Sequence, residues 1–208
     1  MVVEKVPVKR RKSKEMAIPD SLIYETIDGK PFYRKGYREV LNKNKTLEEI
    51  MASSSLQGVV ISHILRIFFK LLDENQYHIL TNEIGVHIEH KNNLASEIGV
   101  YDKKVLTPEK INVHLPDVPA VLFVEVDIKA ELEDTTETGY IRLKTQKLLD
   151  FGAEKVIWIL TKPRQVIIAT PGGKWQLLDW DLDIELFQGH NFNIGQYLKN
   201  EGINPENG

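Results

Sequence analysis

Three ionisable residues follow an apolar stretch near the middle of this chain. Val121 to Val124 is rich in β-branched and aromatic residues, which is typical of a strand covered on both faces. In a continued strand, alternation would point the side chains of Glu125, Asp127 and Lys129 the same way. Carboxylates at the end of a core strand cost free energy unless they are paired or bind a cation. We therefore predict a site for a hard divalent metal here, and the alternative interpretation is a strand end that emerges into water.

A lysine on the next predicted helix is the second candidate. A helix over residues 139–151 places Ile141, Lys144 and Leu148 on one face, which must pack on a sheet. Burying a lysine in that face costs free energy unless its ammonium reaches an anion. Lys144 could reach over the sheet toward Glu125, or it could extend to the helix end and pair with a surface acid.

A third acid, Glu97, precedes a short strand and could place another carboxylate beside Glu125. Two carboxylates with a neighbouring lysine can hydrolyse a phosphodiester. The acids would hold Mg²⁺, which polarises a phosphoryl oxygen and lowers the pKa of bound water. Lys144 would steady the attacking hydroxide and the developing negative charge.

Other local patterns predict the elements that must position these residues. Asp28-Gly29 predicts a hairpin, and Thr46 with Glu49 predicts a capping box at the start of a short helix. Apolar residues at helical spacing predict a longer helix that begins near Ser53 to Ser55. Strands are expected at residues 77–80, 85–89, 96–101, 121–129, 156–160, 166–169, 175–178 and 182–187, and a helical turn at 194–198. No internal repeat interrupts the pattern, so one domain over residues 21–200 is the simplest interpretation.

Composition sets mild limits on function. The chain has 208 residues, no cysteine and a formal net charge of −3, which excludes a disulfide framework and a thiolate metal site. No apolar run approaches the ~20 residues of a membrane span, so we expect a cytoplasmic protein. Residues 1–16 hold six basic and two acidic residues. We interpret residues 1–20 as a disordered basic arm, or one that contacts phosphates, and residues 201–208 as a frayed tail.

Several motifs together resemble the putative restriction-endonuclease family of the PD-(D/E)xK nuclease superfamily. The likeness spans roughly residues 22–180. It rests on Tyr24-Glu-x-x-Asp-Gly29, the helix near Gln57 to Leu72, Ser96-Glu-x-x-Val-Tyr-Asp102, Leu122-Phe-Val-Glu-Val126, and Lys144-x3-Leu148-x3-Gly152-Ala followed by Val-Ile-Trp-Ile-Leu160. The resemblance implies an α/β (α+β) fold, a mixed central β-sheet flanked by helices, with a divalent metal at the end of a β-hairpin.

The resemblance also implies roles for particular positions. Glu97 stands where the family usually has the aspartate of its Pro-Asp pair, and Glu125 stands at the strand carboxylate. Lys144 stands where this family has a lysine displaced onto the helix. Glu83 looks like an acid that many members carry before the metal hairpin, and Gln57 occupies a position where histidine is common.

Two departures from the family pattern affect the predicted site, and one further match to its letters does not. Glutamate in place of aspartate at position 97 moves the carboxylate by ~1.5 Å. Asp127-Ile-Lys129 is a second match to the D-x-K motif. We prefer Glu125 with Lys144 as the catalytic pair, because Lys129 lies farther from the buried end. Asp127 would then be an auxiliary metal ligand. Asp117 also follows a proline, but we interpret it as a loop residue.

The sequence therefore predicts a Mg²⁺- or Mn²⁺-dependent endonuclease that hydrolyses DNA. Its candidate catalytic residues are Glu97, Glu125, Lys144 and Asp127, and its candidate metal ligands are Glu97, Glu125, Asp127 and Glu83. The alternative is a degenerate nuclease fold that serves as a nucleic-acid-binding or assembly module. The sequence does not identify the target or decide between DNA and RNA. It also leaves the oligomeric state open, for which a homodimer is one candidate.

Overall fold

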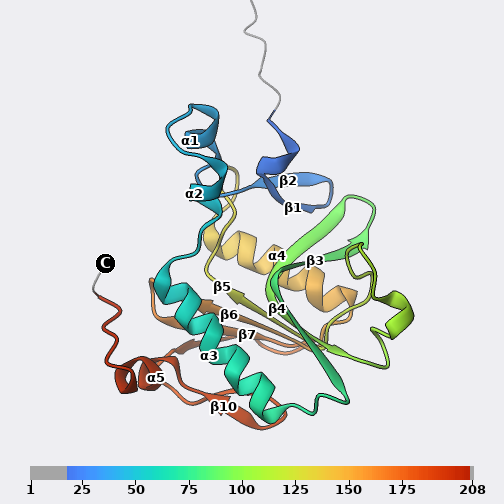
Figure 1. Cartoon of the computed structure of the whole chain (residues 1–208), viewed down its shortest axis with the longest axis vertical. Helices are drawn as coiled ribbons and strands as arrows, with labels where there is room; N and C mark the ends of the chain where they lie inside the picture. The colour runs from blue at the N-terminus through green and yellow to red at the C-terminus, as the bar shows by residue number, and fades with distance from the viewer. Residues whose placement is uncertain (1–17, 207–208) are drawn as a thin grey trace, which may run out of the picture.

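A mixed β-sheet with a helix on each face forms the body of the protein, as the sequence predicts (Figure 1). The computed structural model describes residues 18–206, so most of the predicted N-terminal arm and the last two residues of the tail lie outside the described part. The sheet has eight strands in the order β2-β1-β4-β5-β6-β7-β8, and β3 pairs with β4. Its strands are β1 (Ile23–Ile27), β2 (Lys30–Tyr33), β3 (Tyr77–Glu89), β4 (Asn92–Asp102), β5 (Leu122–Val126), β6 (Lys155–Leu160), β7 (Gln165–Ala169) and β8 (Gln176–Asp179).

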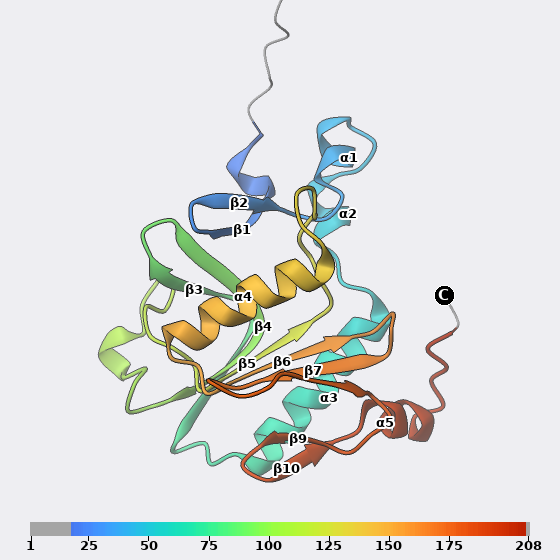
Figure 2. The same ribbon diagram turned by 180° about the vertical axis from the view of Figure 1, so that it is seen from behind.

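The helices and a small second sheet complete the fold. The helices are α1 (Tyr37–Leu41), α2 (Leu47–Met51), α3 (Ser55–Leu71), α4 (Glu137–Phe151) and α5 (Ile194–Asn200), with two 3-10 turns, η1 (Asp20–Leu22) and η2 (Pro108–Lys110). Strands β9 (Ile184–Phe187) and β10 (His190–Phe192) form the second sheet. Helix α3 covers one face of the large sheet and α4 covers the other, as the view from behind shows (Figure 2).

Strand β5 lies at the centre because both faces of its sequence are apolar. It pairs antiparallel with β4 and parallel with β6, and α4 makes the crossover that a parallel pair requires. Phe123 packs on the α4 side of the sheet, whereas Val124 and Val126 pack on the α3 side. Alternation therefore turns Glu125 toward α4.

Local signals predicted several boundaries. Asp28 and Gly29 take positive φ angles of 52° and 76° in the turn between β1 and β2. Thr46 and Glu49 form the predicted capping box of α2. Helix α4 ends at Gly152, whose φ of 125° is easily adopted only by a residue without Cβ.

The region between residues 77 and 89 differs from the prediction. We expected two separate strands, but β3 is one strand with a register shift between Thr81 and Ile84. Asn82 and Glu83 have φ angles of 73° and 52° at this bulge. The bulge interrupts the alternation without ending the pairing, which explains why the pattern looks like two strands. Helix α1 and strand β10 were also not predicted.

Among residues 18–206, every helix is too short or too polar to span a lipid bilayer.

Candidate functional site

Glu125 and Lys144 meet inside the protein, at the end of β5. The Lys144 Nζ lies 3.2 Å from Glu125 Oε2 and 3.1 Å from Glu25 Oε2, so one lysine lies between two glutamates. Lys144 is 0% exposed and Glu125 is 1% exposed. We call Glu25, Glu125 and Lys144 the buried cluster. The expected reach of Lys144 toward Glu125 is confirmed, and the surface ion pair considered as its alternative is not formed.

Aromatic rings complete the surroundings of the buried ammonium. The Lys144 Nζ lies 5.3 Å from the ring centroid of Tyr24, 6.0 Å from that of Tyr140 and 5.5 Å from that of Trp158. The negative faces of aromatic rings attract a cation, and this attraction grows when water is excluded. Lys144 is therefore held as a cation by two carboxylates and three rings.

Glu25 is the member of the buried cluster that sequence reasoning missed. Its Oε1 accepts a hydrogen bond of 2.5 Å from the Tyr140 hydroxyl, and its Oε2 accepts one of 3.3 Å from the Ala95 amide. One signal was available in the sequence. Glu25 is an acid within a short hairpin strand whose neighbours Tyr24 and Ile27 are apolar and buried. An acid in such a strand calls for a buried partner, but the sequence does not show which one.

Burial makes the charge of Glu125 sensitive to pH. Burial, and to a lesser extent the charges of Glu25 and Glu97, raise the pKa of its carboxyl to about 7, although Lys144 acts in the opposite direction. For Lys144, burial acts to lower the pKa, but Glu125 and Glu25 together hold it well above its ordinary value. The Glu125 Oε1 is buried and accepts no hydrogen bond from the described residues. An acceptor left open in this way suits a cation.

A second group of side chains lies beside the first and is partly open to solvent. The Lys129 Nζ lies 2.6 Å from Glu97 Oε1 and 2.9 Å from Glu83 Oε1. Arg34 pairs with the other oxygen of Glu83 at 3.2 Å, and the Gln57 amide donates to Glu97 at 3.5 Å and to the Val126 carbonyl at 2.7 Å. We call Arg34, Glu83, Glu97 and Lys129 the outer cluster. The bulge in β3 supplies Glu83 to it.

Neighbouring strands bring the two clusters together. Ile98 of β4 is opposite Val124 of β5 in an antiparallel pair, so the next residues, Glu97 and Glu125, are neighbours at the same end. The influence of Glu97 on the pKa of Glu125 reflects this closeness. In the part of the chain that the structure describes, no three acidic or histidine side chains are already arranged to hold a metal ion. Of the four predicted ligands, the fold thus brings Glu83, Glu97 and Glu125 into one region.

The prediction that Asp127 and Lys129 share a strand face with Glu125 is wrong. Strand β5 ends at Val126, and Asp127 turns away with a φ of 59°. Its carboxylate accepts hydrogen bonds of 2.7 Å from both the amide and the hydroxyl of Thr161. A short polar side chain tolerates this backbone conformation and satisfies nearby donors, so Asp127 serves the turn after β6.

Lys129 lies farther from the buried end than Lys144, as predicted, but its ammonium contacts Glu97 at 2.6 Å. Asp117 lies in the loop before β5, as predicted.

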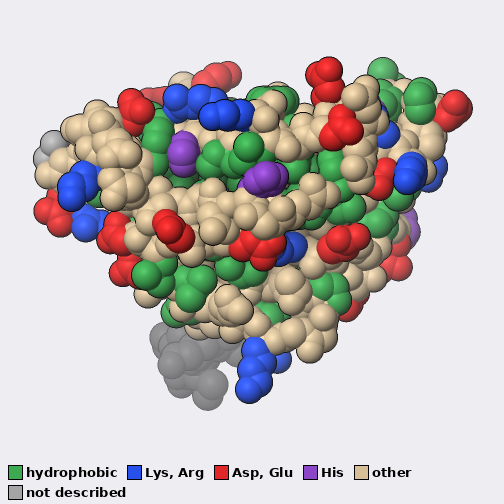
Figure 3. Space-filling view, turned by 90° about the horizontal axis from the view of Figure 1, so that it is seen from below, with side chains coloured by type: hydrophobic (Ala, Val, Ile, Leu, Met, Phe, Trp, Pro, Cys, Tyr) green, Lys and Arg blue, Asp and Glu red, His purple; other side chains and the backbone are tan. Residues whose placement is uncertain are grey.

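A basic cleft opens beside the outer cluster, between α2, the start of α3 and the segment after β5. Its volume is about 360 Å³. Its charged and amide-bearing lining residues are Arg34, Lys35, Lys45, Glu49, Gln57, Asp127 and Lys129. The face on the opposite end of the molecule, by contrast, carries intermixed acidic and basic side chains (Figure 3). The cleft therefore offers an anion a cationic approach to Glu97.

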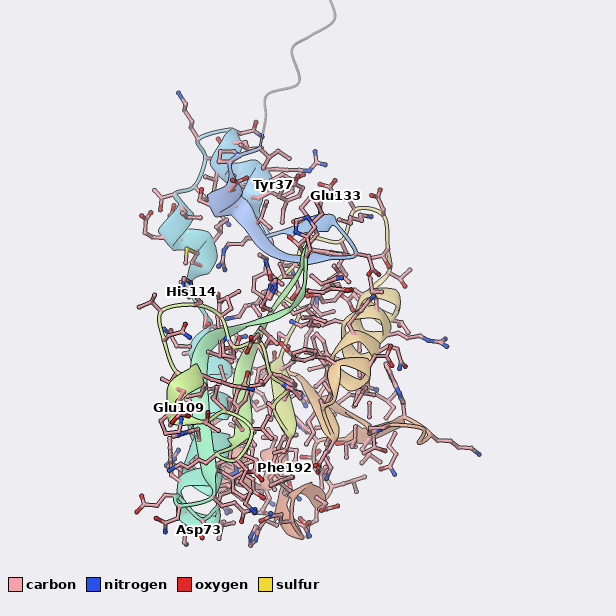
Figure 4. All side chains as sticks on the ribbon, turned by 90° about the vertical axis from the view of Figure 1, so that its right-hand side faces the viewer. Tyr37, Asp73, Glu109, His114, Glu133 and Phe192 are labelled. Atoms are coloured by element: carbon pink, nitrogen blue, oxygen red, sulfur yellow. The ribbon has the colours of Figure 1, made fainter. Side chains whose placement is uncertain are left out.

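Hydrogen bonds hold one wall of the cleft to the segment after β5. The Lys35 amide donates to the Lys129 carbonyl at 2.7 Å, and the Gly36 amide donates to Glu131 at 3.0 Å. The Tyr37 hydroxyl donates to Glu133, and the two side chains lie next to one another (Figure 4). The backbone that carries Lys129 is therefore fixed.

Comparison with solved structures shows a likeness of fold. No protein-family model matches the chain, and no curated protein matches it. A similar solved structure is the crystal structure of "a putative nuclease belonging to DUF820" from Anabaena variabilis ATCC 29413, with a TM-score of 0.60 and 12% sequence identity. The likeness covers 84% of this chain and 89% of that one. At this identity it shows that the two chains share a fold.

Proposed function

We propose that this protein is a metal-dependent nuclease that hydrolyses phosphodiester bonds in DNA. The observation that carries the proposal is the open, buried oxygen of Glu125 next to Glu97 on the adjoining strand. A buried acceptor without a donor costs free energy, and a cation shared with a second carboxylate would remove that cost.

The residues present suit Mg²⁺ or Mn²⁺. Glu97 and Glu125 would hold the ion, because carboxylate oxygens are the ligands that hard divalent cations prefer. When bound, the metal would polarise a phosphoryl oxygen and lower the pKa of bound water. A nearby cation would also favour the ionised form of Glu125, whose pKa is otherwise close to neutral.

The charge balance of the two clusters supports a divalent ion and a singly charged substrate. Glu25, Glu83, Glu97 and Glu125 carry four negative charges when ionised, and Arg34, Lys129 and Lys144 carry three positive ones. A divalent cation would turn this net −1 into +1. A phosphodiester carries one negative charge and would then neutralise the site.

Lys144 acts in this proposal by positioning the carboxylates. Its side chain is fully enclosed and contacts both glutamates of the buried cluster, so it orients Glu125 and opposes its protonation. This role differs from the expected contact of Lys144 with the attacking hydroxide. The charge nearest to an incoming phosphate would instead come from the basic cleft, where Arg34, Lys35 and Lys45 line the approach.

The shared fold also supports the proposal, because the solved structure is described as "a putative nuclease". A fold alone does not establish an activity, so the proposal depends on the carboxylate pair and the cleft.

The test is cleavage of duplex and single-stranded DNA, with RNA as a third substrate, in Mn²⁺ or Mg²⁺ and in EDTA. We expect metal-dependent cleavage by the wild type and a loss of at least about 100-fold in Glu97→Gln and Glu125→Gln, as for loss of a group that stabilises transition-state charge. Asp117→Asn, which alters an acid in the loop before β5, at the end of the strand opposite Glu125, is the control and should cleave normally. Cleavage that survives in EDTA or in both Gln variants would contradict the proposal.

A degenerate nuclease fold is the second candidate, and two observations favour it. Lys129 already pairs with Glu97, and the described residues contain no ready set of three metal-binding acids. DNA binding that needs the basic cleft, without cleavage in any metal, would support this second function.

A further inference from the structure

Lys129 occupies the place between Glu83 and Glu97 where a cation would be expected. Its ammonium lies within 3 Å of an oxygen from each carboxylate, and the Ser53 hydroxyl lies 3.4 Å away. Burial acts to lower the pKa of Lys129, but Glu97 and Glu83 outweigh it and raise the value, so the side chain is cationic. The carboxylates are thus neutralised by a group of the protein itself.

The ammonium of Lys129 has room to move, although its backbone does not. The Lys35 amide fixes the Lys129 carbonyl, and Arg34 pairs in a β-bridge with Ala130. The Lys129 side chain is 17% exposed and lines the basic cleft. A lysine has four rotatable side-chain bonds, so its ammonium can turn from Glu97 into the cleft without a backbone change.

We propose that Lys129 is a resident counter-ion that competes with the divalent metal for Glu97. This inference rests on the proposed function, since it concerns the same metal site. An ammonium and a divalent ion that both contact the Glu97 carboxylate repel one another, so each weakens the binding of the other. Metal binding therefore displaces the Lys129 ammonium toward Glu83 and the cleft.

The displaced ammonium would gain a new role in the cleft. Glu83 keeps its pairing with Arg34 and remains a partner for Lys129, so the lysine stays near Glu97. There it faces the position of an incoming phosphate, to which it adds positive charge. Lys129 would thus keep the carboxylates neutral in the absence of metal and help to position the substrate in its presence.

The test is Mn²⁺ binding measured by calorimetry on the full chain. We expect Lys129→Met to bind Mn²⁺ about tenfold more tightly than the wild type, because the competing cation is gone. Lys129→Arg keeps a cation and should restore an affinity near that of the wild type. Lys147→Met removes a surface lysine that pairs with Asp28 and not with Glu97, and its effect should stay within about twofold because exposed charges are screened.

The outcomes separate this inference from the proposed function. If the wild type binds Mn²⁺ and Lys129→Met binds it equally or less tightly, Lys129 is not a competitor, and the metal site stands. If neither protein binds Mn²⁺, both ideas fail. A second measurement is KM for DNA at saturating Mn²⁺, which should rise in Lys129→Met despite tighter metal binding, and an unchanged KM would remove the proposed role toward phosphate.

Discussion

The buried and outer clusters have the same arrangement, a lysine between two glutamates, in different surroundings. Lys144 lies between Glu25 and Glu125 with no exposed surface, whereas Lys129 lies between Glu83 and Glu97 with 17% of its side chain exposed. Burial removes the alternative partners that water offers, so the first lysine is permanent and the second can be exchanged. Solvent access, and not residue type, separates a positioning lysine from one that a metal could displace.

Replacing each lysine by methionine should show the largest difference between the clusters. Lys144→Met leaves two buried carboxylates without a cationic partner, and we expect it to lower the free energy of unfolding by about 3–5 kcal/mol. Lys129→Met should lower it by less, about 1–2 kcal/mol, because Glu83 is partly exposed and keeps its pair with Arg34, so only Glu97 is left buried without a cation. Urea denaturation measures both values.

Lys147→Met is the matched control on the same helix. Lys147 pairs with Asp28 on the surface and should be replaceable with little change in stability. Equal losses for Lys144→Met and Lys147→Met would show that the buried cluster does not stabilise the fold.

Glu125→Gln should change how stability depends on pH. The folded protein raises the pKa of Glu125 to about 7 from an ordinary value of 4.5, so the native state binds this proton more tightly than the unfolded state. Wild-type stability should therefore fall relative to Glu125→Gln as the pH rises from 4.5 to 7, by about 3 kcal/mol at ~1.4 kcal/mol per pKa unit. Urea denaturation at pH 5 and pH 8 measures the difference, and parallel pH profiles would contradict the assignment.

Asp127 tests whether the turn after β5 belongs to the metal site. Asp127→Ala should lower the free energy of unfolding by about 1–2 kcal/mol, since it removes two hydrogen bonds from Thr161 and places alanine at a positive φ. Asp127→Asn keeps an acceptor and tolerates this φ, so its Mn²⁺ affinity should match that of the wild type. A large loss of Mn²⁺ binding in Asp127→Asn would restore Asp127 as a ligand.

Salt should give the smallest effect. In a double-mutant cycle, the coupling between Lys129 and Glu83 should be about 0.5–1 kcal/mol at low salt and smaller at 0.5 M, because salt screens a pair that is partly open to solvent. The coupling between Lys144 and Glu25 should change little over this range. Equal salt dependence would show that water reaches both lysines alike.

Some features of the site were predictable because they depend on neighbours in the sequence. The helical period places Lys144 on the apolar face of α4, and that face is buried. Strand alternation turns Glu125 toward the same side of the sheet. Neither pattern indicates Glu25 as their common partner, because Glu25 joins them only through the packing of a hairpin distant in the sequence.

The errors have a physical reason as well. An alternating pattern of acids does not show where a strand stops, and β5 stops when Asp127 takes a positive φ that Thr161 stabilises across the sheet. Similarly, the bulge that brings Glu83 to Lys129 interrupts the alternation of apolar residues, so the sequence of β3 predicts two strands where the structure has one. Both outcomes depend on hydrogen bonds to partners outside the local segment.

Local chemistry thus predicts most of the elements of this protein and indicates the candidate residues Glu97, Glu125 and Lys144. The period of a helix, the alternation of a strand and the choice of capping residues act over a few positions, and one chain displays them directly. Packing between distant segments decides which acids pair with each lysine and forms the cleft beside Glu97. It also sets the solvent exposure that makes the ion pairs of Lys144 permanent and those of Lys129 exchangeable. Those contacts depend on distances in space that spacing along the chain does not encode.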